Sequence, residues 1–196
     1  MMKFNPLIAA LLLAVVAAPA AAANSVYTAV LDGASEAPPN SSPGTGTATV
    51  TIDTDAGTMR VQESFSGLTG GNTASHIHCC TALPGTGTAP VATTVPTFTG
   101  FPSGVTSGTY GHTFNMLDAS SYNPSFITAN GGTIDSAFGA FVAGLNTGTA
   151  YANIHTPMFP AGEIRGFLAP IPEPETYAMF LAGLALMSGV ARRRRN

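Results

Sequence analysis

Three of the four histidines in the chain fall in two short segments that could bind a metal ion. His76 and His78 are separated by one residue, and side chains alternate between the two faces of a β-strand. These two imidazoles should therefore project from one face, about 6–7 Å apart. His155 lies in a second segment of strand character, and Glu163 opens the strand expected after it. Because imidazole suits copper or zinc, we treat His76, His78, His155 and Glu163 as candidate metal ligands.

A structural role for the same histidines is the competing interpretation, and it is the commoner outcome for such a pair. A His-x-His pair in a strand can hydrogen-bond to loop carbonyls or threonines and so order the edge of a sheet. The fourth histidine, His112, stands alone in the sequence, and we expect it to be structural or on the surface. Both interpretations stay open on the sequence alone.

Cys79 and Cys80 are adjacent and are the only cysteines of the chain. In an oxidising environment outside the cytoplasm they are not expected to remain free thiols. The pair can form a vicinal disulfide, bridge to another chain, or add a thiolate to a metal site beside His78. We favour the vicinal disulfide; the chain contains no third cysteine for a longer-range bridge.

The sequence contains no set of residues arranged for catalysis. The adjacent histidine and cysteines lack a third group to orient a base. Glu163 and Arg165 lie on one face of a strand at i and i+2, which could place a carboxylate near a site but is more typical of an ion-paired surface. The other acidic residues are scattered, and no two of them suggest the paired carboxylates of a glycosidase. We therefore expect a protein that is not an enzyme.

The segments that must position these residues have the pattern of short β-strands. Residues 45–52 and 58–65 alternate between apolar and polar side chains around a turn at residues 55–57, which predicts a β-hairpin, although Glu63 interrupts its apolar face. Further strands are expected at residues 26–31, 73–79, 108–116, 149–155 and 163–168. Residues 81–107 are rich in Gly, Pro and Thr and are predicted to be mainly loop.

One segment has helical spacing. Apolar residues recur on one stripe over residues 134–145, Thr133 can cap its start, and Gly144 or Gly148 its end. The predicted fold class is therefore all-β: an antiparallel β-sandwich, immunoglobulin-like or superoxide-dismutase-like, with one short helix.

The N-terminal end of the chain has the pattern of a secretory signal peptide, predicted at residues 1–23. Lys3 precedes an uninterrupted apolar run, and small residues follow it. We expect signal peptidase to cleave between Ala23 and Asn24. The exported domain would then comprise residues 24–171.

The C-terminal end, residues 172–196, has three consecutive parts. Pro172, Glu173 and Pro174 form a rigid extended start, and residues 177–191 form a short apolar stretch. As a helix these residues would reach about 22 Å, less than a hydrocarbon core of about 30 Å, so the predicted transmembrane segment is marginal in length. The basic cluster at the very end should keep that side cytoplasmic; it consists of Arg192, Arg193, Arg194 and Arg195.

The charge of the chain is unevenly distributed. Residues 24–171 contain eight acidic residues but only Arg60 and Arg165 as basic ones, so this region has a net charge of −6. Binding to nucleic acid depends on clustered Lys and Arg, and we exclude it for this domain.

The three-part C-terminus resembles the PEP-CTERM sorting signal of Gram-negative, exopolysaccharide-producing bacteria. The resemblance covers residues 172–196. It implies recognition near Pro172, Glu173 and Pro174 by an exosortase-type membrane enzyme, cleavage, and delivery from an inner-membrane intermediate to the cell surface. A simple tail anchor without processing is the alternative.

The central region resembles the CHRD domain, which is named for the repeats of chordin and is widespread in exported bacterial proteins. The resemblance spans about residues 26–169 and rests on five motifs in order: residues 31–39, 67–68, 74–78, 151–156 and 162–166. It implies an all-β extracellular module with no assigned reaction. The His-x-His strand is also similar to the copper ligands of copper–zinc superoxide dismutases, but four histidines are too few for that two-metal set.

These observations support two functional hypotheses, one for a binding or structural module and one for a metal-binding domain. The leading one is a non-catalytic binding or structural module at the cell surface or in the extracellular matrix, with extracellular polysaccharide or surface proteins as its partners. The alternative is a copper- or zinc-binding, or metal-dependent redox, domain that uses His76, His78 and His155.

Overall fold

The computed structural model describes residues 24–171, together with residues 183, 184 and 187. The predicted signal peptide, the Pro172-Glu173-Pro174 motif and the terminal arginines lie outside the described residues. Within the described part, none of the helices combines the length and the apolar character needed to span a membrane.

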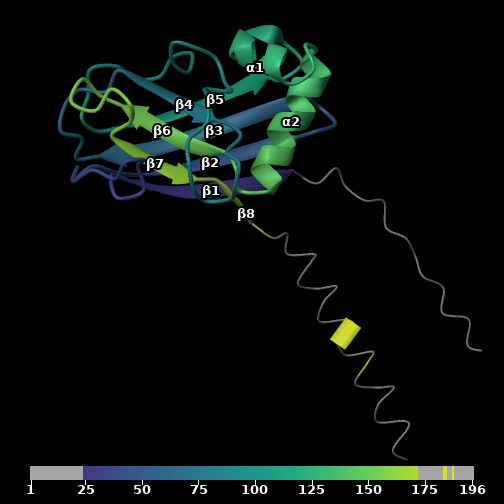
Figure 1. The fold of residues 1–196 in the computed structure, drawn as a ribbon, viewed down its shortest axis with the longest axis horizontal. Coiled ribbons are helices and arrows are strands. Elements are labelled where there is room, and N and C mark those ends of the chain that lie inside the picture. The colour runs from purple at the N-terminus through teal and green to yellow at the C-terminus, as the bar shows by residue number, and fades with distance from the viewer. Residues whose placement is uncertain (1–23, 172–182, 185–186, 188–196) are drawn as a thin grey trace, which may run out of the picture.

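Eight strands form one antiparallel sheet that curls into a half-barrel (Figure 1). The order across the sheet is β4-β6-β7-β1-β2-β3-β5, and β8 pairs with β1 beside this path. The strands are β1 (Ser25–Asp32), β2 (Thr45–Asp53), β3 (Thr58–Ser66), β4 (Ala74–His78), β5 (Gly108–Asn115), β6 (Tyr151–His155), β7 (Ile164–Phe167) and β8 (Ala169–Pro170). The predicted antiparallel all-β fold is confirmed, with the strands joined in one continuous sheet.

The predicted hairpin is β2 and β3, paired along their whole length with Val50 opposite Val61. Gly57 adopts a φ of +63° in the connecting turn, a conformation that side chains with a Cβ rarely adopt. The interruption at Glu63 is real: this carboxyl group points into the core, is 3% exposed, and accepts a hydrogen bond from the Ser75 hydroxyl at 2.8 Å.

The predicted helix is α2 (Ile134–Asn146), which crosses the strands at one end of the sheet (Figure 1). The Thr133 hydroxyl accepts a hydrogen bond from the Ser136 amide and caps its start, as predicted. Phe141 and Leu145 are fully buried in the core beneath the helix. A second, shorter helix, α1 (Pro124–Ala129), and a 3₁₀ turn, η1 (Ala119–Ser121), precede it and were not predicted.

The predicted loop at residues 81–107 is largely irregular, but part of it lies along the edge of β4. The Ala92 amide donates to the Ile77 carbonyl at 2.9 Å, and the Ile77 amide donates to the Thr93 hydroxyl at 3.0 Å. Phe98 from the same segment is fully buried in the core. The loop therefore covers an edge strand that would otherwise expose unpaired backbone groups.

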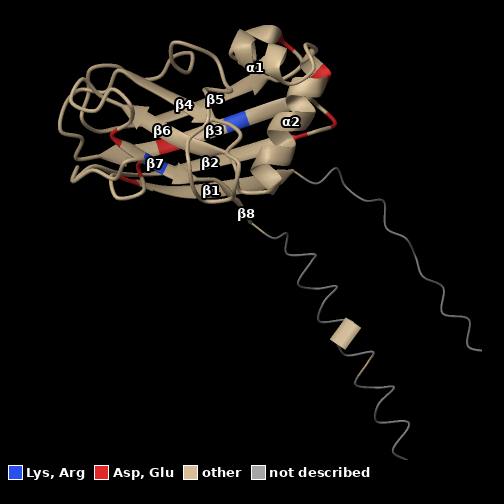
Figure 2. Ribbon diagram, in the orientation of Figure 1, with Lys and Arg blue, Asp and Glu red and all other residues tan. Residues whose placement is uncertain are grey.

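The two ends of the folded domain lie side by side. The Ile171 amide donates a 2.8 Å hydrogen bond to the Val26 carbonyl at the start of β1, and β8 pairs with Tyr27 and Thr28. The chain thus enters and leaves the domain at the same end of β1. Charged residues, coloured blue and red, are few along the ribbon of the folded domain (Figure 2).

Candidate metal centre

The pairing of β4 with β6 brings three histidines together on one face of the sheet. His76 lies opposite Asn153, and Ala74 lies opposite His155. His76, His78 and His155 therefore share the face away from Ile77 and Ile154, which belong to the hydrophobic core. One potential ligand atom from each histidine lies within 4.8 Å of the others.

Each of the three rings is held by a hydrogen bond from one nitrogen to a backbone carbonyl in a loop. The partners are Nε2 of His76 with Pro96 O at 2.5 Å, Nδ1 of His78 with Ala89 O at 2.8 Å, and Nδ1 of His155 with Pro160 O at 3.0 Å. A carbonyl oxygen can only accept, so the nitrogen facing it carries the proton. The second nitrogen of each neutral ring is left with a free lone pair.

Those second nitrogens are buried and have no hydrogen-bond partner. They are Nδ1 of His76, Nε2 of His78 and Nε2 of His155. Buried polar atoms without partners are rare in folded proteins, and three imidazole nitrogens with free lone pairs are suited to coordinate an ion. A backbone carbonyl that fixes the tautomer and orientation of a histidine is also a recurrent feature behind metal-binding imidazoles.

The histidines are neutral at pH 7. Burial lowers the pKa of His76 to about 4 and that of His78 to about 4, and it also lowers the pKa of His155. Metal binding by imidazole requires the unprotonated ring, so these residues are ready to act as ligands without first losing a proton.

Tyr151 and Arg165 form the side of the cluster next to His78. The His78 ring is stacked on the Tyr151 ring, and the Arg165 guanidinium lies 4.9 Å from the centre of the same Tyr151 ring. Arg165 is 4% exposed and donates to the carbonyls of Ser35 and Gly87. Tyr151 and Asn153 fall within the motif at residues 151–156 that carries the family resemblance, but neither was predicted to be part of the site.

The expected pairing of Arg165 with Glu163 is wrong. Arg165 lies 3.8 Å from the carboxylate of Glu36, in the loop that follows β1. Glu36 and Arg165 are far apart in the sequence, and their contact depends on how the loop folds back over β7. The pairing could therefore not be predicted from the sequence.

Glu163, the fourth candidate ligand, is occupied elsewhere. Its carboxylate accepts hydrogen bonds from the Ser42 hydroxyl at 2.6 Å, the Thr69 amide at 2.6 Å and the Thr156 hydroxyl at 2.6 Å. It does not belong to the histidine cluster. Its place is structural: it joins three loops at one end of the sheet.

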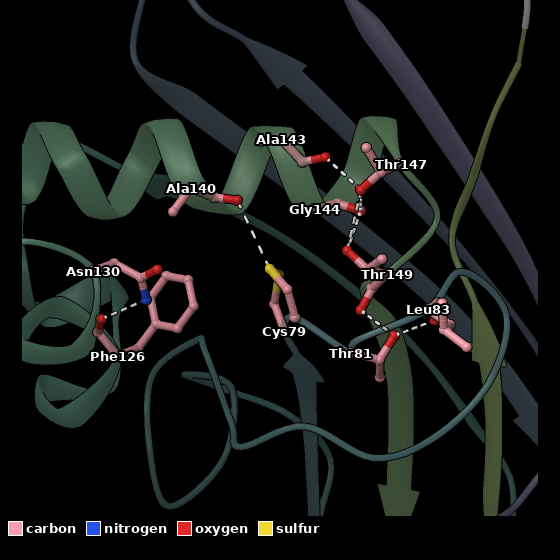
Figure 3. The surroundings of a disulfide bond; sticks show 11 residues. Cys79, Thr81, Leu83, Phe126, Asn130, Ala140, Ala143, Gly144, Thr147 and Thr149 are labelled. Carbon is pink, nitrogen blue, oxygen red and sulfur yellow. Dashed lines mark hydrogen bonds between the residues drawn. A yellow bond between two sulfur atoms is a disulfide. The ribbon is translucent and has the colours of Figure 1, made fainter.

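Cys79 and Cys80 form the predicted vicinal disulfide. Both sulfur atoms lie against α2, where a Cβ on Gly144 would be only 2.3 Å from the Cys79 sulfur (Figure 3). Cys79 belongs to the hydrophobic core, on the opposite face of β4 from His76 and His78. The alternative of a thiolate ligand beside His78 is therefore wrong in this structure.

His112 lies outside the cluster, on β5. Its ring is half-buried, with its centre 4.6 Å from that of Phe114 and 6.3 Å from that of Tyr110. This placement agrees with the structural role expected for it.

Comparison with known proteins gave two family matches. The family model described as the CHRD domain matches residues 27–168, and the model described as the PEP-CTERM protein-sorting motif matches residues 170–195. No curated protein and no solved structure matches the chain.

Proposed function

The chain belongs to the CHRD domain family, and we propose that it acts outside the cytoplasm as a non-catalytic binding module whose ligand, inferred from the three-histidine cluster, is a transition-metal ion. Its C-terminal motif is a signal for export and cell-surface sorting in Gram-negative bacteria, which implies processing by an exosortase-type enzyme. The finer steps are part of the proposal: removal of the signal peptide, an inner-membrane intermediate held by residues 177–191, and display among extracellular polysaccharide or surface proteins.

The observation that supports metal binding is the set of three buried, unpartnered imidazole nitrogens. A cluster with a purely structural role would be expected to use both nitrogens of its rings, because a buried lone pair without a partner is costly. Here the loop carbonyls of Pro96, Ala89 and Pro160 use only one nitrogen of each ring. The other three converge, and imidazole nitrogens suit copper and zinc.

Metal analysis tests this part of the proposal. The full chain is purified, freed of metal with a chelator, incubated with copper or zinc, and passed over a desalting column. We expect about one bound ion per chain, and none in the double variant His76→Ala/His78→Ala. The matched control is His112→Gln, which removes an imidazole outside the cluster and should retain the ion. Equal metal content in the double variant and the wild type would exclude the site.

The sorting part is tested separately. The full chain is expressed in a host with and without its exosortase-type enzyme, and its size and location are followed. We expect a shorter, surface-located product only when the enzyme is present, and loss of this processing in the variant Pro172→Ala/Pro174→Ala. A product of unchanged size and location in both hosts would contradict the proposal.

A further inference from the structure

The three imidazole rings form a nearly equilateral triangle. The ring centres are 5.9 Å apart for His76 and His78, 5.2 Å for His76 and His155, and 5.8 Å for His78 and His155. An ion about 2.0–2.1 Å from each nitrogen lies about 3.2 Å from each ring centre. Three such rings are then about 5.5 Å apart around a trigonal ion and about 5.2 Å apart around a tetrahedral one.

A square-planar ion would produce a different triangle. Two sides would be about 4.5 Å and the third about 6.4 Å, because two of the three ligands would lie opposite each other. The observed sides differ by less than 1 Å. The three rings are therefore arranged for trigonal or tetrahedral coordination of an ion and not for the tetragonal geometry of Cu(II).

The ligand set carries no negative charge. Its members are neutral imidazoles, and in the described part of the chain neither a carboxylate nor a thiolate belongs to the cluster. Glu163 accepts three hydrogen bonds elsewhere, and Glu36 is paired with Arg165. A bound ion would keep its full formal charge, unless an anion entered with it.

The surroundings disfavour that charge. His76 is 7% and His78 8% exposed, so an ion between them loses most of its hydration. Arg165 adds a positive charge on the far side of the stacked ring pair, with its guanidinium 4.9 Å from the centre of the Tyr151 ring on which His78 is stacked. Arg165 repels a doubly charged ion twice as strongly as a singly charged one. The cost of removing water from the ion rises even more steeply with its charge.

We infer that the three-histidine centre selects Cu(I), held by Nδ1 of His76, Nε2 of His78 and Nε2 of His155, over Zn(II) and Cu(II). This inference rests on the proposed function, since it names the ion for the same site. Arg165 contributes to the selectivity through its charge, without touching the ion.

The test is a set of competition titrations on the purified, metal-free full chain. Cu(I) is titrated without oxygen against a colorimetric chelator, and Zn(II) and Cu(II) are titrated against chelators of known affinity. We expect one Cu(I) per chain, bound at least about a hundredfold more tightly than Zn(II). X-ray absorption at the copper edge should show three nitrogen ligands. Zn(II) or Cu(II) affinity equal to or above that for Cu(I) would overturn the inference while leaving the proposed function intact.

The two proposals fail in different ways. If none of the three ions binds the wild type more tightly than it binds His76→Ala/His78→Ala, the proposed metal site itself is excluded, and the inference with it. If the ions bind but Cu(I) is not preferred, only the inference is overturned.

The contribution of Arg165 is tested with two variants of opposite effect. At pH 8, Glu36→Gln removes the negatively charged partner of Arg165 but still allows the hydrogen bonds of Arg165 to Ser35 and Gly87. We expect the ratio of Cu(I) affinity to Zn(II) affinity to increase by about three- to tenfold. Arg165→Gln should narrow it, provided that its circular dichroism spectrum shows a folded protein. A purely structural effect would change the affinities for Cu(I) and Zn(II) equally. An unchanged ratio of these two affinities in Glu36→Gln would overturn the role of Arg165 in selectivity.

Discussion

The imidazole of His78 is stacked on the phenol ring of Tyr151, with ring centres 4.8 Å apart and planes 7° from parallel. The Tyr151 hydroxyl also accepts from the Ala89 amide and donates to the Ala89 carbonyl, both at 3.2 Å. That same carbonyl faces Nδ1 of His78. One tyrosine thus fixes the plane of the ring and the loop that sets its tautomer.

Removing this hydroxyl should loosen the candidate metal centre without unfolding the domain. In Tyr151→Phe the ring stack remains but both bonds to Ala89 are lost, and we expect a loss of about 1–2 kcal/mol in the free energy of unfolding. Copper affinity should fall several-fold, because His78 loses its fixed orientation. Thermal unfolding and copper titration measure the two effects. A larger loss in Tyr151→Leu is expected, and identical copper affinity in all three proteins would refute the role.

Two glycines of α2 should respond in opposite directions to the same substitution. A Cβ at Gly144 would lie 2.3 Å from the Cys79 sulfur and 2.4 Å from the Cys80 sulfur, so Gly144→Ala should destabilise the domain by about 1–3 kcal/mol. Gly139 has open space at its Cβ position, and Gly139→Ala should stabilise it by about 0.5–1 kcal/mol. Chemical denaturation of both variants checks the pair. Similar effects at the two positions would mean that the sulfurs are not packed against the helix.

Glu63 should make the domain less stable as the pH rises. Burial raises its pKa to about 8, so the folded state keeps a proton that the unfolded state loses near pH 4.5. The free energy of unfolding therefore falls between pH 4.5 and 8. Above pH 6.5 the histidines no longer oppose this trend, because the lowered pKa values of His76 and His78 act only between about pH 4 and 6.5.

The variant Glu63→Gln isolates this effect, since it keeps an acceptor for Ser75 but cannot ionise. Its stability relative to the wild type should rise from pH 6.5 to pH 8 by up to about 2 kcal/mol, at about 1.4 kcal/mol per pH unit. Urea unfolding at several pH values measures the difference. A difference that does not change with pH would show that Glu63 titrates normally.

The disulfide should be dispensable for metal binding. Its sulfurs pack against α2 on the core side of β4, away from His76 and His78. We expect the variant Cys79→Ser/Cys80→Ser to bind the same amount of copper as the wild type once its folding has been verified. In the wild type, alkylation should modify the cysteines only after reduction. Loss of copper from a folded serine variant would place a sulfur in the metal centre.

Local pattern was sufficient to predict the elements whose determinants are close in sequence. Alternation predicted β2 and β3 and their turn, and helical spacing with Thr133 predicted α2. The short helix α1 was missed even though Asn123 caps it and Pro124 occupies its first turn, because six residues give too little apolar periodicity.

The candidate metal centre was only partly predictable for a related reason. His76 and His78 share a face by strand geometry alone, but His155 joins them through a pairing of β4 with β6, whose register no local signal encodes. The same limitation applies to polar contacts between distant loops. Glu163 was expected beside the histidines and instead bonds Ser42 and Thr69, and Arg165 was expected beside Glu163 and instead faces Glu36.

The closeness of Val26 and Ile171 determines which way the domain would face on a surface. The histidines sit toward the other extremity of the sheet, since the row that contains His76 continues through β6 and β7 to Asp32, the last residue of β1. Eight residues of extended chain separate the two extremities by more than about 20 Å. A domain attached through its C-terminal end would hold the three-histidine side outward, toward the surrounding medium.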